Sequence, residues 1–188
     1  MTQRYKHSRG YLPHFNVALS TQFITFRLAD SMPQNLLKIW KLELDHGEIT
    51  DVEFRKRVEY YLDQGYGSCC LSDRRIAAKI KETLLRWDEE KYRLISWVVM
   101  PNHVHFLIQL TDEISLSEIM HSIKSYTAHQ ANKILERHGQ FWSIESFDRY
   151  IRDERHFLNS VNYIENNPVK AGLCSEPSEW EFGSAFSG

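Results

Sequence analysis

The sequence predicts an α+β fold built around one antiparallel sheet, and three observations support this prediction. Residues 21–28 alternate polar and apolar side chains, as a half-buried strand does. Residues 93–99 and 103–110 are apolar runs joined by Pro101-Asn102, a typical turn pair, so they predict a hairpin. Segments with helical spacing of apolar residues flank this hairpin. The chain of 188 residues is long enough for one sizeable core.

The helical segments are identified by apolar spacing and by capping residues. They cover about 33–44, 51–62, 73–88, 115–135 and 153–167. Pro33 suits a first helical turn, and Ser115-Leu116-Ser117-Glu118 fits a capping box. Asn167-Pro168 is expected to end the last helix.

A fourth strand is expected at residues 146–151. In chain order, the elements match a ferredoxin-like split β-α-β fold with an antiparallel sheet. A helical insertion at about 32–90 and an extra C-terminal helix are added to this plan. We expect a single domain over residues 1–188, with part of the insertion outside the minimal core.

Composition and charge limit the class of protein. The formal net charge of −2 gives no global electrostatic reason to bind nucleic acid, so a polyanion would need a local basic patch. The three cysteines fit neither a disulfide framework nor a zinc site, which favours a reducing compartment. The first residues lack an apolar signal core, and no apolar run could cross a bilayer. We therefore expect a soluble cytoplasmic protein that does not bind membranes.

The most informative feature is a pair of histidines inside an apolar strand. His103 and His105 flank Val104, and residues i and i+2 of a strand point to the same face. Two imidazoles at a sheet edge can be satisfied by neighbouring residues alone. Burying two of them without a shared ligand costs free energy, however, so the pattern favours one divalent metal bound by both. Imidazole suits zinc, manganese and other transition ions, so the pair does not identify the metal.

A second candidate group lies on the last predicted helix. Tyr163 and Asn167 are spaced i and i+4, which places them on one helix face. An amide oxygen at Asn167 can complete a metal site begun by two histidines, and Tyr163 would then stand beside the metal as a potential nucleophile. The same spacing also fits an ordinary core tyrosine and a helix-end asparagine before proline. The pattern alone leaves both interpretations open.

Longer segments around these residues make the chain similar to a known family. They are 10–15 (GYLPHF), 98–105 (VVMPNHVH), 124–128 (KSYTA), 147–153 (FDRYIRD) and 163–173 (YIENNPVKAGL). In these segments the chain resembles the REP-associated tyrosine transposases. These are single-tyrosine members of the HUH endonuclease superfamily, related to the IS200-like transposases. The similar segments are spread over nearly the whole chain.

The resemblance implies a function and a set of site residues. His103, His105 and Asn167 match the metal ligands, and Tyr163 matches the catalytic tyrosine. The cofactor would be Mg²⁺ or Mn²⁺, with no organic cofactor. The partner would be single-stranded, hairpin-forming DNA with REP-like repeats. Attack by Tyr163 would give a 5′-phosphotyrosine and a free 3′-hydroxyl, and the protein would act as a monomer or homodimer.

Two alternatives remain open beside this interpretation. Tyr126, with Gln130 at i+4, is a competing nucleophile, because a Tyr-x-x-x-Gln helix carries the catalytic tyrosine in related insertion-sequence transposases. A non-catalytic regulator that binds repeat DNA and retains the HUH fold is the alternative function. A small-molecule metallohydrolase, a third class, would have no affinity for DNA. The residues expected to contact DNA are Arg149, Arg152, Lys124 and Trp142.

Overall fold

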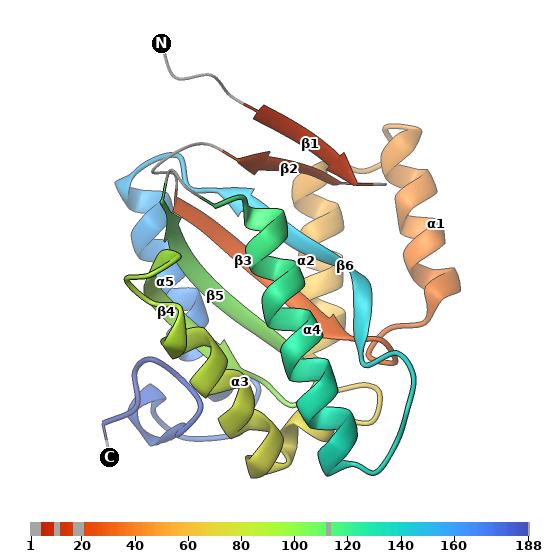
Figure 1. The fold of residues 1–188 in the computed structure, drawn as a ribbon. Coiled ribbons are helices and arrows are strands. Elements are labelled where there is room, and N and C mark those ends of the chain that lie inside the picture. The colour runs from red at the N-terminus through yellow and green to blue at the C-terminus, as the bar shows by residue number, and fades with distance from the viewer. Residues whose placement is uncertain (1–4, 10–11, 17–20, 112–113, 188) are drawn as a thin grey trace.

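The computed structural model describes residues 5–9, 12–16, 21–111 and 114–187, and a four-stranded antiparallel sheet forms its centre (Figure 1). The strands are β3 (Thr21–Leu28), β4 (Tyr92–Val99), β5 (His103–Leu110) and β6 (Trp142–Tyr150). Their order across the sheet is β4-β5-β3-β6, and every neighbouring pair is antiparallel. A helix comes directly before β4 and another directly before β6, and together with the strand order this confirms the predicted ferredoxin-like α+β fold.

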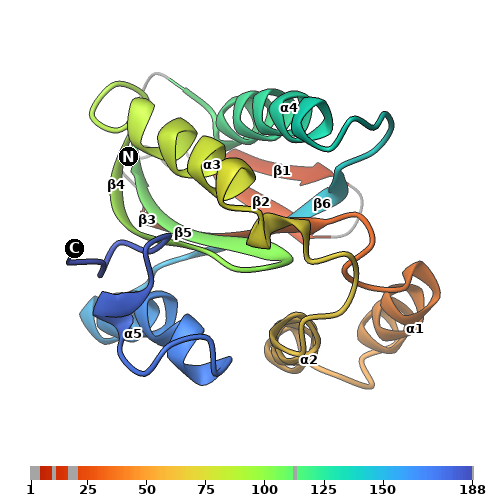
Figure 2. The ribbon, with the colours of Figure 1, turned by 90° about the horizontal axis from the view of Figure 1, so that it is seen from below.

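The five helices divide between the two faces of the sheet. They are α1 (Gln34–Asp45), α2 (Asp51–Asp63), α3 (Arg74–Arg86), α4 (Leu116–Ile134) and α5 (Glu154–Lys170). Figure 2 shows α3 and α4 on one face and α1, α2 and α5 on the other. Two short 3₁₀ turns, η1 (Cys70–Ser72) and η2 (Pro177–Glu179), complete the set of helical elements. No helix in the described ranges is both long and apolar enough to cross a membrane.

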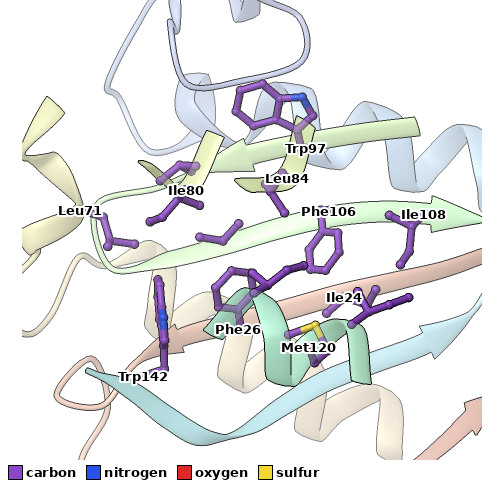
Figure 3. Packing of buried hydrophobic residues seen from close by; sticks show 14 of the residues in the cluster. Ile24, Phe26, Leu71, Ile80, Leu84, Trp97, Phe106, Ile108, Met120 and Trp142 are labelled. Atoms are coloured by element: carbon purple, nitrogen blue, oxygen red, sulfur yellow. The ribbon is translucent and has the colours of Figure 1, made fainter. Parts of the chain in front are cut away.

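The main core lies between the sheet and the α3–α4 pair. Alternate residues of β3 and β5, such as Ile24, Phe26 and Phe106, point into it and are fully buried (Figure 3). The ring of Phe26 packs against Phe106 and against Trp142 at centroid distances of 5.9 and 4.6 Å. The cluster on this face is hydrophobic, and His103, His105, Tyr163 and Asn167 lie outside it.

The opposite face of the sheet is divided between two smaller apolar clusters. One joins α1 and α2 to Phe147 of β6, and the other joins α5, through Ile164, to Phe23 and Leu107. The residues of β3 and β5 that point away from the main core include Thr25, which lies beside the two histidines of β5. The fold therefore places polar side chains on the face that α2 and α5 share.

The last helix ends later than the sequence predicts. It was expected to end before Pro168, but α5 continues through Pro168 to Lys170. A Schellman motif explains the extra turn: Gly172 has φ of +71°, its N–H donates to Val169 O, and the Leu173 N–H donates to Pro168 O. These bonds stabilise the helix end beyond the proline, so Asn167 is a helical residue and not a terminal one.

Two further differences concern strands. The structure contains a separate hairpin of β1 (Tyr5–Arg9) and β2 (Leu12–Asn16) that the sequence did not predict. Gly10 and Tyr11, part of the first family-like segment, lie outside the described residues. Strand β6 begins at Trp142, four residues before the expected start, because pairing with β3 resumes at Leu28 after an irregularity in the register.

The predicted insertion at about 32–90 contains two different structures. Its last helix, α3, packs on the main core and belongs to the basic fold, whereas α1 and α2 form a separate pair over β6. At the other edge of the sheet, the C-terminal segment covers β4: Ser184 N donates to Trp97 O at 2.8 Å, and Val99 N donates to Phe182 O at 2.8 Å. A single domain over residues 1–188 remains a prediction.

Replacing Phe26 should test the assignment of the main core. The ring is fully buried, so Phe26→Ala should lower the free energy of unfolding by about 3–5 kcal/mol through lost burial and a cavity. Urea unfolding followed by circular dichroism measures this loss. Ile144→Ala is the control: Ile144 is 87% exposed, so its replacement should change stability by less than about 0.5 kcal/mol. Equal effects of the two substitutions would contradict the assignment.

Candidate active site

Strand β5 brings the two predicted histidines together. The Nε2 atoms of His103 and His105 are 3.0 Å apart, and both side chains are buried from solvent. The predicted side-by-side placement on one face is confirmed. Burial lowers the pKa of His103 to about 3. The pKa of His105 is also well below its usual value, mainly through burial and further through His103, Arg149 and Lys170. Both imidazoles are therefore neutral at pH 7, the form that binds a metal.

The outer nitrogen of each imidazole has a partner of its own. The Nδ1 atom of His103 is 2.7 Å from Asn102 Oδ1, and the Nδ1 atom of His105 is 2.7 Å from Thr25 Oγ1. Metal-binding histidines commonly use their second nitrogen in this way, because the bond fixes the orientation of the ring. The Nε2 atoms of both rings face a common point between the two imidazoles.

Helix α5 supplies Tyr163 to the same region and carries Asn167 one helical turn later. The Tyr163 ring lies 5.4 Å from the His105 ring and 5.9 Å from the Phe23 ring, measured between centroids. The Asn167 side chain is 1% exposed, and neither its Oδ1 nor its Nδ2 atom forms a hydrogen bond with a described residue. The Tyr163 hydroxyl is also buried without a hydrogen-bond partner among the described residues. Such groups are rare in folded proteins and commonly mark a site that binds something else.

The donor set can be tested for its fit to a divalent metal. Two nitrogens that each lie about 2.1 Å from one ion at right angles are about 3.0 Å apart. This matches the distance between the Nε2 atoms of His103 and His105. In the described part of the chain, no three His, Cys, Asp or Glu side chains gather into a metal-binding group. A third protein ligand would therefore be of another type, and the unpaired Asn167 Oδ1, one helical turn from Tyr163, is a candidate.

Charged residues surround Tyr163, and they include two carboxylates of α2 that the sequence did not single out. Glu59 and Asp63 of α2 raise the pKa of the Tyr163 phenol, after the larger effect of burial, whereas Arg149 lowers it. Arg149 Nη1 lies 3.8 Å from Glu59 Oε1, and Lys170 Nζ donates to Asp63 Oδ2 at 2.7 Å. The α2 residues are about a hundred positions from Tyr163, so no spacing in the sequence links the two groups.

Helix α4 lies on the opposite face of the sheet from the histidines. It carries Tyr126, the alternative nucleophile, which is 46% exposed. Within one chain, the sheet therefore separates Tyr126 from His103 and His105, whereas Tyr163 contacts His105.

The residues predicted to contact DNA are found in different surroundings. Arg149 and Arg152 lie at the end of β6 and just after it, and Arg152 is exposed. Trp142 is buried in the main core, where its Nε1 donates to Thr127 Oγ1, so its ring has no face open to a base. Lys124 Nζ donates to the carbonyl oxygens of Ser143 and Ile144 and is partly buried. The positions of Trp142 and Lys124 therefore do not favour the predicted DNA contacts.

A pocket opens beside the site on the face shared by α2 and the sheet. Phe23, Val58 and Phe147 provide its apolar lining, and Arg55 and Arg149 are among its charged lining residues. Thr25 also lines it and links it to His105 through the bond to Nδ1. The Arg149 guanidinium stacks 4.2 Å from the centroid of the Phe23 ring, which also contacts His105 and Tyr163.

The buried histidines should make the stability of the metal-free protein depend on pH. The folded pKa of His103 lies below its unfolded value of 6.5, so only the unfolded chain gains this proton as the pH falls from 6.5 towards 3. At pH 5, His103 should lower the free energy of unfolding by about 2 kcal/mol relative to pH 7.

Urea titrations in EDTA at pH 7 and pH 5 measure this effect. His103→Gln should have a smaller loss between the two pH values, whereas His138→Gln, at an exposed histidine, should behave like the wild type. An unchanged pH dependence in His103→Gln would contradict the burial of a neutral His103.

Comparison with known proteins agrees with the fold. The family model described as "Transposase IS200 like" matches residues 69–167, just over half of the chain. The chain is 26% identical over 97 residues to the REP-associated tyrosine transposase of Escherichia coli (strain K12), covering 51% of this chain and 56% of that protein.

A putative REP-associated tyrosine transposase of Haemophilus influenzae is 25% identical over 103 residues, covering 50% of this chain and 58% of that protein. The chain thus spans just over half the length of these curated relatives. A solved REP-associated tyrosine transposase bound to a REP hairpin has a TM-score of 0.55 and 18% identity, covering 96% of this chain and 82% of its own. This likeness shows the fold. The family match includes His103, His105, Tyr163 and Asn167, and the protein belongs to the IS200-like transposase family.

Proposed function

We propose that the protein is a metal-dependent endonuclease and strand transferase that acts on single-stranded, hairpin-forming DNA with REP-like repeats. The observation that carries this proposal is the meeting of two elements distant in sequence. Strand β5 presents two neutral imidazoles, and helix α5 places Tyr163 against one of them and carries the buried, unpaired Asn167 amide one helical turn later. Binding DNA alone would not require this combination of a nucleophile and ligands.

Each residue has a distinct role in the proposed reaction. His103, His105 and Asn167 would hold Mg²⁺ or Mn²⁺, which polarises the scissile phosphate when bound. Tyr163 Oη attacks the phosphorus and forms a new O–P bond, while the bond to the 3′-oxygen breaks. The phenol proton is lost from Tyr163, and the leaving oxygen takes up a proton to become a 3′-hydroxyl. The product is a 5′-phosphotyrosine, a phosphodiester that a 3′-hydroxyl can later attack to rejoin a strand.

The surroundings of Tyr163 control when this attack can occur. Burial and the carboxylates of Glu59 and Asp63 raise the pKa of the phenol, so it stays protonated in the closed site. A positive charge close to the oxygen is needed to lower that pKa. Arg149 and Lys170 carry such charges but are paired with Glu59 and Asp63. This requirement supports a site in which the metal ion and the scissile phosphate of the DNA bind together beside Tyr163.

A pocket lies beside the site, between α2 and the sheet. Its lining combines the apolar side chains of Phe23, Val58 and Phe147 with two arginines, Arg55 and Arg149, and with the carboxylates of Glu59 and Asp148, so it carries no net positive charge. Arg152 is exposed just beyond the end of β6. We expect a phosphate of the DNA to compete with these carboxylates for the arginines, because the whole chain has a formal net charge of −2 and gives no global attraction for DNA.

Two tyrosine variants test the nucleophile. Tyr163→Phe should abolish the covalent protein–DNA adduct because it removes the attacking oxygen, whereas Tyr126→Phe should retain it. The substrate is a library of 3′-labelled hairpin oligonucleotides with randomised single-stranded flanks, incubated with Mn²⁺ or Mg²⁺. A 5′-phosphotyrosine keeps the labelled 3′ fragment on the protein, so denaturing gels detect the product. Loss of the adduct in Tyr126→Phe alone would overturn the assignment. Hairpin binding with no adduct under any condition would favour the non-catalytic regulator.

A second experiment tests the metal ligands. EDTA should abolish adduct formation, and Asn167→Ala should slow it by about tenfold or more because one ligand is lost. Asn166→Ala is the matched control: this neighbouring amide bonds within α5, to Asn162 O and Oδ1, and should leave the rate nearly unchanged. Full activity in EDTA, or equal effects of the two substitutions, would argue against the proposed site.

A further inference from the structure

Asn102 connects the first histidine to a different part of the fold. Its side chain is 1% exposed, and its Nδ2 atom donates to Leu62 O at 3.1 Å and to Tyr66 O at 3.0 Å. These carbonyls belong to the last turn of α2 and to the turn that follows it. That turn packs closely on residues 30–31: a Cβ on Gly67 would lie 2.8 Å from Asp30 O, and Ser68 N donates to Asp30 Oδ2. Both acceptors of the Asn102 amide are therefore held in place.

This arrangement fixes the position of a proton on His103. A carbonyl oxygen only accepts hydrogen bonds, so the Asn102 nitrogen must face Leu62 and Tyr66, and its oxygen must face His103. An amide oxygen also only accepts, so the Nδ1 atom of His103, 2.7 Å away, must carry the hydrogen. The Nε2 atom of His103 is left with a lone pair directed at His105.

His105 is not fixed in the same way. Its Nδ1 atom faces Thr25 Oγ1 at 2.7 Å, and a hydroxyl can either donate or accept. Its Nε2 atom lies 3.0 Å from His103 Nε2, and at this distance one of the two nitrogens must carry a hydrogen. In metal-free protein, that hydrogen belongs to His105 Nε2, and Thr25 donates to His105 Nδ1.

We propose that Asn102 and Thr25 are positioning residues with different tasks: Asn102 permanently presets His103 for a metal, whereas Thr25 lets His105 change tautomer when a metal binds. A metal ligand needs an unprotonated Nε2, so on binding the His105 hydrogen moves from Nε2 to Nδ1. The Thr25 hydroxyl then rotates from donor to acceptor. Both imidazoles stay neutral throughout, and no proton leaves the site. The inference rests on the metal site of the proposed function, but not on DNA cleavage.

Nitrogen NMR of the full chain with ¹⁵N-labelled histidine tests the tautomers, because protonated and unprotonated ring nitrogens differ widely in chemical shift. In EDTA we expect hydrogen on Nδ1 of His103 and on Nε2 of His105. With Zn²⁺ as a diamagnetic probe, His103 should keep its tautomer and His105 should change to the Nδ1–H form. Hydrogen on Nε2 of His103 in EDTA, or an unchanged His105 on Zn²⁺ binding, would overturn the proposal.

Zn²⁺ titration calorimetry of variants provides an independent measurement. Asn102→Ala should weaken Zn²⁺ binding by about 10–100-fold. Thr25→Val, which keeps the shape but removes the hydroxyl, should weaken it to a similar degree, and Thr25→Ser should bind like the wild type. If Asn102→Ala does not fold, the Thr25 pair still decides the proposal. Wild-type affinity in both a folded Asn102→Ala and Thr25→Val would overturn it.

The same titration separates this inference from the proposed function. Zn²⁺ binding that is lost in His105→Ala, together with the expected tautomers but no DNA adduct, would support the positioning residues and contradict the endonuclease. Absence of Zn²⁺ binding in the wild type would overturn the positioning roles, and the adduct assay with Mn²⁺ or Mg²⁺ would decide the endonuclease separately. Adduct formation with an unchanged His105 tautomer would contradict the positioning roles alone.

Discussion

The structure depends on the strict alternation of side chains along β5. Val104, Phe106 and Ile108 point into the core beneath α3 and α4, and His103 and His105 point to the other face. One strand therefore anchors the largest apolar cluster and presents the candidate ligands. A register slip by one residue would exchange the two sets, placing imidazoles in the core and apolar side chains in the site. The tight packing of the core is thus also what holds the histidines in place.

The rest of the site is assembled by elements that share only this face of the sheet. Helix α5 supplies Tyr163 and Asn167, and α2 supplies the carboxylates that pair with Arg149 and Lys170. The apolar contacts of Ile164 with Phe23 and Leu107 fix α5 over the sheet, and those of Phe54 and Val58 fix α2. Burial of these hydrophobic residues therefore sets the distance between Tyr163 and the histidines, although none of the hydrophobic side chains bears a reactive group.

Sequence patterns located the regular elements well because most of them carry local signals. The capping box at Ser115 and Glu118 is present, and β3 and β5 have the predicted bounds. The placement of the two histidines on one face was predictable because the two-residue alternation of side chains along a strand is a local pattern in the sequence. The roles of Asn102, Glu59 and Asp63 could not be found in this way, since their partners are distant in the chain. The end of α5 was predicted too early because Pro168 is a helix-stop signal on its own, whereas the Schellman motif at Gly172 stabilises the helix beyond it.

The neutrality of the proposed ligand set has a consequence for how the site is filled. Two uncharged imidazoles and an amide leave a bound divalent ion with both of its positive charges, unlike sites built from carboxylates. The nearby Glu59 and Asp63 are already engaged by Arg149 and Lys170 and do not compensate that charge. An ion bound in the proposed site would therefore be best balanced by an anion from outside the protein. By thermodynamic linkage, such an ion and a phosphodiester would each raise the affinity of the other, so the nucleic acid would itself take part in coordinating the ion.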